Sequence, residues 1–215
     1  MSEEKKELER ETSVEETAPE QKAEEEKQPE RLENSIYDWA RSLTAAVVGV
    51  VLLFTFLARL IGVSGPSMQD TLYTGDRILV LNAMFCDFQL GDVVVVNDYN
   101  AQLDDTLVKR IIAVGGQTVD IDFVTGTVYV DGVALDEPYT KEPTYTTDGT
   151  VFPLTLAEDE VFIMGDNRNH STDSRSTRLG AVKEGYIQGK AIFLLFPGET
   201  PDTQKRDWSR IGFID

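Results

Sequence analysis

Apolar residues form one long run near the start of the chain and a series of short runs after it. Between Leu43 and Ala58 no side chain is charged, and the apolar run resumes after Arg59 and continues to Val63. The 21 residues from Leu43 to Val63 would span roughly 31 Å as an α-helix, about the thickness of the hydrocarbon core of a bilayer. The pattern therefore predicts a single transmembrane anchor over residues 36–63.

Two other interpretations of the long run fit the pattern less well. A cleavable signal peptide begins with a short basic segment, whereas 42 mostly acidic residues precede this run. A core helix of a small domain needs a polar face, and this run is apolar on every side. An anchor places Tyr37 and Trp39 at one membrane interface and Arg59 near the other. Arg41 and Arg59 flank the two ends of the span, so positive charge does not indicate its orientation. We expect the N-terminal side to be cytoplasmic, because a polar segment of 42 residues is more simply left in the cytoplasm while the larger C-terminal part is exported.

The segment before the anchor is polar and acidic. Residues 1–35 contain few apolar side chains and are rich in Glu, Lys, Gln and Pro. Such a segment cannot bury enough surface to offset its chain entropy, so we expect a disordered acidic cytoplasmic tail. Residues 1–42 hold thirteen Glu and one Asp against four Lys and three Arg, and the whole chain has a net charge of −18. A nucleic-acid partner is not expected, because a phosphate backbone requires a basic face.

From residue 64 onwards the apolar runs are short, rich in β-branched and aromatic residues, and separated by Gly and Asp. This pattern is typical of strands and predicts an all-β, mainly antiparallel domain over residues 64–215. The more polar stretch 115–159, which contains three prolines, predicts a small β insertion between two core strands, with a hairpin turn at 124–127. The expected strands are 77–81, 92–96, 106–114, 117–122, 127–132, 160–165 and 186–196.

The chain has one cysteine, Cys86, and one histidine, His170. These numbers exclude an internal disulfide, a metal site with several cysteines and a metal centre with several histidines. We expect Cys86 to be a small core residue. Any chemistry must therefore use Ser, Lys, Asp, Glu or Tyr, with at most one imidazole.

Ser67 lies in a Ser-Gly-Pro-Ser-Met turn directly after the predicted anchor. The Gly-Pro pair restricts the backbone and presents a hydroxyl together with free backbone N–H groups. A serine in such a turn is by itself more often a turn residue than a nucleophile.

Lys109 and Arg110 interrupt the apolar strand 106–114. Strand alternation places them on opposite faces, so one cation must project from an apolar face. One explanation is a gatekeeper lysine on an edge strand. The other is a desolvated lysine whose pKa falls towards neutrality, so that its amine can accept a proton. In that case Arg110 needs an acidic partner.

A polar loop with the sequence G-D-N-R-N-H-S-T-D-S-R occupies residues 165–175. It does not match an EF-hand calcium loop, because Arg168 and Ser171 stand where that loop needs an acidic or amide residue and a glycine. A Ser-His-Asp triad built within the loop is implausible, since sequence neighbours rarely converge in that geometry. A loop that satisfies its own polar groups is the simplest alternative.

Together, the anchor and these motifs resemble bacterial type I signal peptidases, which are serine proteases with a Ser-Lys dyad. The resemblance implies a membrane-anchored serine endopeptidase that removes N-terminal signal peptides from exported pre-proteins, after small residues at positions −1 and −3. It also implies an extracytoplasmic catalytic domain, the lipid bilayer and the export machinery as partners, and neither a metal nor an organic cofactor. The resemblance covers residues 36–198 and rests on S-G-P-S-M-Q-D-T-L at 64–72, G-D-V-V-V-V at 91–96, K-R-I-I-A-V-G-G at 109–116 and the loop at 165–175.

The resemblance implies a role for each matching residue. Ser67 matches the nucleophile, its backbone N–H the oxyanion hole, and Lys109 the general base. Ser171 matches the hydroxyl that orients the lysine amine, and Met68 a residue that packs beside the nucleophile. The two implied structural ion pairs are Asp166 with Arg110, and Asp173 with Arg175.

Several positions depart from the family pattern. Gly65 stands where some relatives carry a hydroxyl that adds a second oxyanion donor, and Asp70 stands where proline is usual. Residues 115–117 replace a Pro-Gly-Asp, and His170 replaces an asparagine. His170 is either a modulator beside Ser171 or a plain loop residue. None of these changes removes the matched nucleophile, base or orienting hydroxyl.

Two other functions remain open at this level. A self-cleaving repressor-type protease shares the Ser-Lys chemistry and a β core, but the anchor and the long polar loop argue against it. An anchored β domain that only displays a binding surface would tolerate the loss of Ser67 or Lys109, whereas both are present. The apolar group Met84, Phe85 and Phe88 either docks the domain on the bilayer or belongs to its interior.

Overall fold

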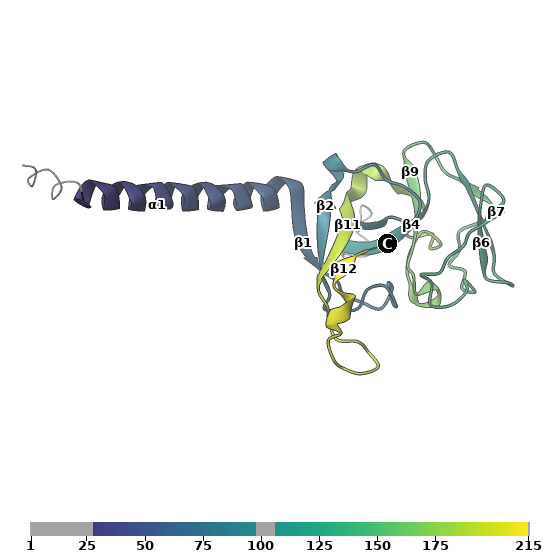
Figure 1. Ribbon diagram of the computed structural model, residues 1–215. Coiled ribbons are helices and arrows are strands. Elements are labelled where there is room, and N and C mark those ends of the chain that lie inside the picture. The colour runs from purple at the N-terminus through teal and green to yellow at the C-terminus, as the bar shows by residue number, and fades with distance from the viewer. Residues whose placement is uncertain (1–27, 98–105, 215) are drawn as a thin grey trace, which may run out of the picture. The chain divides into compact units, whose positions relative to one another are not determined.

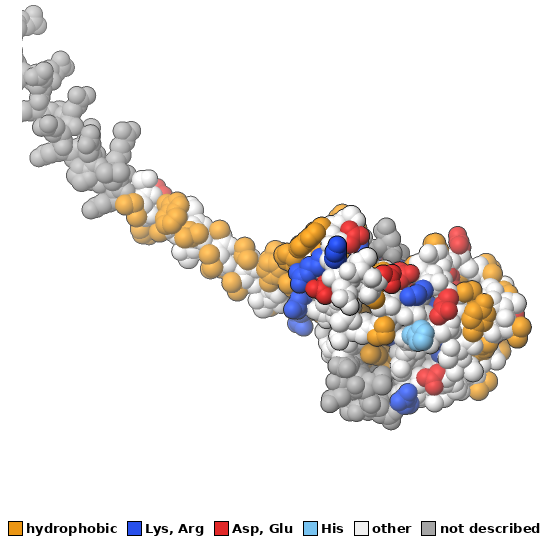
Figure 2. All heavy atoms as spheres, turned by 90° about the horizontal axis from the view of Figure 1, so that it is seen from below, with side chains coloured by type: hydrophobic (Ala, Val, Ile, Leu, Met, Phe, Trp, Pro, Cys, Tyr) orange, Lys and Arg blue, Asp and Glu red, His pale blue; other side chains and the backbone are white. Residues whose placement is uncertain are grey.

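The computed structural model describes residues 28–97 and 106–214 (Figure 1). The chain divides into two compact units, Met1–Val50 and Val51–Asp215. Helix α1, Gln28–Leu52, continues as one π-helical turn, η1, Leu53–Leu57. Residues Ser35–Leu57 are long and apolar enough to cross a membrane, and none of this span is buried. Figure 2 shows apolar side chains along this helix, as expected for a surface that faces lipid.

Both ends of the helix differ from the sequence prediction. The predicted disordered tail 1–35 is too long, because residues 28–35 belong to α1; residues 1–27 lie outside the described residues. A proline at position 29 is compatible with this start, since the first helical turn needs no N–H donor there. The predicted anchor 36–63 is also too long, because Ala58–Gly62 forms strand β1. β1 pairs with β2, Arg77–Asn82. The local apolar pattern does not reveal this pairing, because the partner strand is distant in the sequence.

Eight strands form one sheet, with the order β1-β2-β11-β3-β4-β9-β10 and with β12 paired to β11. Every pairing in this sheet is antiparallel. The prediction of a mainly antiparallel all-β fold is therefore confirmed. The strands β10 and β12 were not predicted, because two residues are too few to show the alternation of apolar and polar positions. The strands after β2 are β3 Val93–Asn97, β4 Thr106–Ala113, β9 Glu160–Met164, β10 Val182–Lys183, β11 Ile187–Phe196 and β12 Gly212–Phe213.

A second antiparallel sheet, with the order β7-β6-β5-β8, lies between β4 and β9 in the chain. All four of its strands fall within residues 115–159, so the small β insertion is confirmed. The predicted hairpin joins β5 to β6, with Asp122 opposite Thr127. In Figure 1 β6 and β7 lie on the opposite side of the domain from β1 and β2. The bounds are β5 Thr118–Asp122, β6 Thr127–Val130, β7 Val133–Ala134 and β8 Leu154–Thr155.

Strand β4 contributes to all three apolar clusters of the interior. Val108 packs with residues of β2, β3 and β11, Ile112 packs with residues of the insertion, and Ile111 packs with residues of β3 and β9. A strand that is apolar on both faces is buried on both faces. The two cations of β4, Lys109 and Arg110, consequently lie inside the protein, at 3% and 1% exposure.

Candidate active site

Ser67 lies in the turn between β1 and β2. Gly65 has a φ of 90°, a left-handed conformation that favours glycine and redirects the chain just before Ser67. The N–H of Leu72 donates to the carbonyl of Met68 at 2.7 Å, and both side chains are buried in the apolar cluster beside β2 and β11. Burial of Met68, directly after the half-buried Ser67, anchors the turn to the main sheet.

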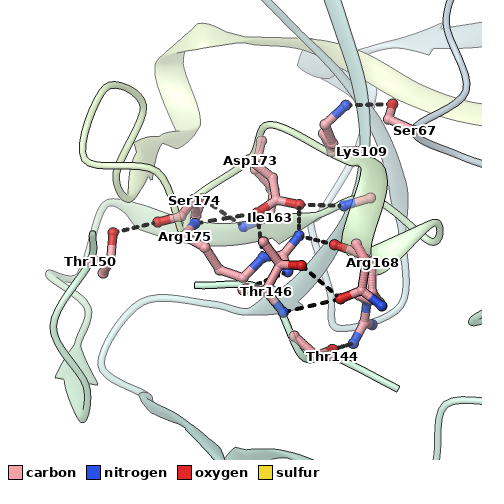
Figure 3. Close-up of polar contacts among 12 residues, drawn as sticks. Ser67, Lys109, Thr144, Thr146, Thr150, Ile163, Arg168, Asp173, Ser174 and Arg175 are labelled. Carbon is pink, nitrogen blue, oxygen red and sulfur yellow. Dashed lines mark hydrogen bonds and ion pairs between the residues drawn. The ribbon is translucent and has the colours of Figure 1, made fainter. Parts of the chain in front are cut away.

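Lys109 lies in β4 opposite Val94 of β3. Its Nζ is 2.7 Å from the Oγ of Ser67 (Figure 3), and it donates to the carbonyl of Val108 at 3.2 Å. Because β4 lies between β3 and β9, the gatekeeper interpretation, which requires an edge strand, is wrong. The fold thus places an amine and a hydroxyl in hydrogen-bond contact at the edge of the protein interior.

Burial lowers the pKa of the Lys109 ammonium from 10.5 to about 8. The cause is desolvation, because removal from water disfavours the charged form of the amine. The carboxylates of Asp173 and Asp166 partly oppose this change by raising the pKa, whereas Arg175 lowers it. Near pH 8 a substantial fraction of the amine is therefore neutral and able to accept a proton.

Arg110 forms a bidentate ion pair with Asp166, as the sequence analysis expected. Nε and Nη2 of Arg110 donate to the two carboxylate oxygens at 3.0 and 2.9 Å, and Nη1 donates to the carbonyl of Gly91 at 2.7 Å. The hydroxyl of Thr71 donates to the same carboxylate at 2.5 Å. Thr71 lies four residues after Ser67 in sequence, so it ties the segment that carries the hydroxyl to the ion pair on the lysine strand. The sequence motifs assign no role to Thr71.

Asp173 and Arg175 form a second expected ion pair, within the polar loop after β9 (Figure 3). Nε and Nη2 of Arg175 each donate to the carboxylate at 2.8 Å, and the N–H of Gly165 donates to it at 3.0 Å. Arg175 also donates to the carbonyls of Arg168 and Thr146, at 2.6 and 3.0 Å. The loop does satisfy many of its own polar groups, and these buried contacts hold it in one shape.

Ser171 lies close to the Ser67 turn. Its Oγ is buried and has no hydrogen-bond partner among the described residues. A Cβ placed on Gly165 would lie 2.3 Å from this Oγ and 2.4 Å from the carbonyl oxygen of Ser67. Only glycine therefore fits between the two serines. The hydrogen bonds of Lys109 do not include Ser171, so the orientation of the amine by Ser171 stays a prediction.

Asn167 also contacts the Ser67 turn, although sequence analysis predicts no role for it. Its N–H donates to the carbonyl of Ser67 at 3.0 Å, and its Nδ2 donates to the carbonyl of Pro66 at 3.1 Å. Asn169, two residues later in the same loop, instead accepts the N–H groups of Tyr145 and Thr146 at 3.0 Å. Nothing in the local sequence distinguishes the two asparagines, because only the long-range packing decides which one meets the turn.

Glu137 and Tyr139 from the insertion provide a further set of contacts that sequence analysis missed. The carboxylate of Glu137 accepts hydrogen bonds from Nη1 and Nη2 of Arg168 at 2.9 and 2.5 Å. The ring centre of Tyr139 lies 4.0 Å from the guanidinium carbon of Arg110, and its hydroxyl donates to Glu137 at 3.1 Å. The insertion is therefore packed against both the lysine strand and the polar loop.

The other sequence candidates make no hydrogen bond to Ser67 or Lys109 in the part of the chain that the structure describes. His170 is exposed, and Cys86 is half-buried rather than a core residue. Phe88 is half-buried and packs against an interior apolar cluster, whereas Met84 and Phe85 are exposed. No three His, Cys, Asp or Glu side chains gather as a metal site within residues 28–97 and 106–214.

Comparison with known proteins gives one consistent family. The family model described as "Signal peptidase, peptidase S26" matches residues 36–196. A signal peptidase I of Bacillus amyloliquefaciens is 35% identical over 174 residues, with coverage of 77% of this chain and 90% of the relative. A probable signal peptidase I-1 of Synechocystis is 35% identical over 181 residues, with coverage of 79% and 84%. The crystal structure of a signal peptidase I from Enterococcus faecalis is 28% identical with a TM-score of 0.39, and covers 49% of this chain and 97% of that chain.

The matched range includes the hydroxyl and amine in contact, both buried ion pairs and the polar loop. It also begins within the apolar helix, at residue 36, so a single family model matches both part of the helix and the β domain. This chain belongs to the signal peptidase family, peptidase S26.

Proposed function

We propose that this protein is a membrane-anchored serine endopeptidase that removes N-terminal signal peptides from exported pre-proteins. The observation that carries the proposal is the 2.7 Å contact between the Oγ of Ser67 and the Nζ of the buried Lys109. The relatives that are named signal peptidase I support the substrate class.

Lys109 is the general base in this mechanism. Its neutral amine accepts the proton of the Ser67 hydroxyl while Oγ attacks the carbonyl carbon of the scissile peptide bond. The ammonium then donates this proton to the leaving amine, so the peptide C–N bond breaks and an ester forms on Ser67. The same amine deprotonates a water molecule, which hydrolyses the ester and frees the hydroxyl. The lowered pKa of Lys109, about 8, supports this role.

The backbone N–H of Ser67 is the oxyanion donor. In the described part of the chain it donates to no protein acceptor, which leaves it available to the developing negative charge. Ser171 orients the amine of Lys109, and its buried, unpartnered Oγ beside Gly165 supports this assignment. The two ion pairs, Asp166 with Arg110 and Asp173 with Arg175, brace the lysine strand and the polar loop.

The helix Ser35–Leu57 anchors the enzyme in the bilayer. We place the N-terminal segment in the cytoplasm and residues 64–215 outside, where pre-proteins arrive from the export machinery. The substrate binds as an extended strand, and shallow pockets accept small residues at positions −1 and −3 while they exclude bulky ones.

The test uses the full-length protein in lipid vesicles and a pre-protein that carries alanine at −1 and −3 of its signal peptide. The wild type should produce a single cut after the −1 alanine, read by the masses of both products. Ser67→Ala and Lys109→Met should each lower kcat by about 10³-fold or more, because nucleophile or base is lost. Lys183→Met is the matched control, since this exposed lysine pairs with Asp159 at the surface, and its kcat should stay within about twofold.

Leucine in place of the −1 alanine tests the substrate specificity and should abolish the specific cut. Cleavage by Ser67→Ala at the wild-type rate would show that another group is the nucleophile. Equal cleavage of the leucine and alanine substrates would contradict the proposed pockets. It would not affect the conclusions about Ser67 and Lys109, which rest on their own variants.

A further inference from the structure

Asn167 holds both carbonyl groups that flank the Cα of Ser67. Its N–H donates to the carbonyl of Ser67 at 3.0 Å, and its Nδ2 donates to the carbonyl of Pro66 at 3.1 Å. Asn167 is 3% exposed, so its own donor groups are shielded from water. The amide nitrogen must be the atom that faces Pro66, because a carbonyl oxygen can only accept a hydrogen bond.

The carbonyl of Pro66 and the N–H of Ser67 belong to one peptide group. This group is planar and trans, so its N–H points in the opposite direction to its C=O. A donor that fixes the carbonyl therefore also fixes the direction of the N–H. The N–H of Gln69 donates to the same carbonyl at 3.2 Å, but Gln69 belongs to the same turn and moves with it. Asn167, which lies in the polar loop, holds this peptide group in position relative to a part of the fold outside the turn.

Asn167 is itself held from both sides by buried ion pairs. The preceding residue, Asp166, pairs with Arg110 on the lysine strand, and the following residue, Arg168, pairs with Glu137 of the insertion. The aspartate, Arg110 and Arg168 side chains are each about 1% exposed. Asn167 thus has little freedom to follow a movement of the turn, and it can resist such a movement.

We propose that Asn167 is a positioning residue for the oxyanion hole, holding the Pro66–Ser67 peptide group so that the Ser67 N–H faces the carbonyl oxygen of the substrate. The inference rests on the proposed function, which assigns this N–H to the oxyanion. A preoriented donor stabilises the transition state more than the bound substrate, so Asn167 acts on kcat rather than on KM. It makes no hydrogen bond to Lys109, so the pH dependence that Lys109 sets should not change.

The test compares Asn167→Leu with the wild type, because leucine has a similar shape and cannot donate. We expect kcat to fall about 10- to 100-fold, KM to stay within about twofold, and the midpoint of the pH–rate profile to stay in place. A peptide aldehyde with the substrate sequence forms a hemiacetal with the serine hydroxyl and so probes the oxyanion site directly. Its affinity should fall by the same factor as kcat, while the affinity for the corresponding peptide alcohol should not change.

Asn169→Leu is the matched control, since it removes an amide two residues later in the same loop, which bonds to Tyr145 and Thr146 instead of the Ser67 turn. Its kcat and aldehyde affinity should stay within about twofold of the wild type. A wild-type kcat in Asn167→Leu, or equal losses of aldehyde and alcohol affinity, would overturn the inference. If Asn167→Leu does not fold, Asn167→Ala, which also lacks the side-chain donor and adds no charge, replaces it. Failure of both variants to fold would show a purely architectural role. Inactive wild-type enzyme would instead refute the proposed function.

Discussion

Lys109 shows at the scale of one residue how position changes chemistry. On an exposed edge strand its ammonium would keep an ordinary pKa and could not accept the proton of a neighbouring hydroxyl at neutral pH. On β4 it is almost completely buried beside Ser67, and the loss of hydration outweighs the nearby carboxylates of Asp173 and Asp166. The amine is suited to the proposed role of general base because desolvation is the largest of the effects on its pKa.

The pH dependence of cleavage follows from this lowered pKa. The ammonium form cannot accept the Ser67 proton, so kcat/KM should rise about tenfold per pH unit up to about pH 8 and level off above it. The measurement is kcat/KM of pre-protein cleavage between about pH 6 and 10 in one ionic strength, with Lys183→Met as the control for general charge effects. A midpoint near 10.5, the ordinary value of a lysine, would show that burial does not set the basicity of Lys109.

At the scale of elements, strand β4 and helix α1 stand out by where their side chains lie. β4 presents apolar residues to both faces of the sheet and carries one cation on each face. One cation is neutralised by Asp166, whereas the other has a hydroxyl as its neighbour. α1 and η1 have apolar side chains exposed all along Ser35–Leu57, which suits contact with lipid rather than with protein.

The proposed anchoring role of the span Ser35–Leu57 is tested by placing charge near the centre of this span. Val47 and Val50 are both about half exposed, and an arginine in the middle of a membrane span costs about 2.5–3.5 kcal/mol. The double variant Val47→Arg/Val50→Arg should therefore move from the membrane pellet to the supernatant after extraction with alkaline carbonate. Val47→Leu/Val50→Leu, with the same positions changed but no charge, should stay in the pellet. Retention of the arginine variant in the pellet would mean that this helix is not the anchor.

The whole molecule joins segments that are far apart in the chain around the Ser67 turn. The insertion reaches the site through Glu137 and Tyr139, and the C-terminal segment reaches it through Arg210. Arg210 makes a bidentate ion pair with the fully buried Asp76 at 3.1 and 2.7 Å and donates to the carbonyl of Thr71 at 3.1 Å. Residue 210 lies beyond the range of the family match, which ends at residue 196, so this brace is additional to the matched region.

Removal of the Arg210 brace should destabilise the β domain. Arg210→Met leaves the buried carboxylate of Asp76 with only backbone donors, so the free energy of unfolding should fall by about 3 kcal/mol. Urea unfolding of the full-length protein in detergent measures this loss, and Arg206→Met, at an exposed position near the same end, should unfold like the wild type. In Arg210→Met/Asp76→Asn the loss should be smaller than the sum of the single losses. An unchanged urea midpoint in Arg210→Met would show that the pair contributes nothing.

Local patterns predicted most of the fold. The long apolar run indicated the membrane helix, and each predicted strand run between 77 and 196 corresponds to an observed strand, because burial on one or both faces imposes its period on nearby residues. Motifs and their order also singled out Ser67, Lys109 and the loop at 165–175. The predicted end of the anchor at residue 63 was wrong, because a strand such as β1 is defined by its partner and not by its own composition.

The tertiary structure alone decided how these parts function together. Whether Lys109 is a surface gatekeeper or a buried amine depends on its strand being interior, which follows from the order β3-β4-β9 and not from the residues of β4. Thr71, Tyr139 and Asn167 acquire contacts with the site only because loops far apart in sequence pack against one another. The sequence by itself determined which groups are present and which segments are apolar. Distance, desolvation and hydrogen-bond direction arise only when the chain has folded, because each depends on atoms that are remote along the chain.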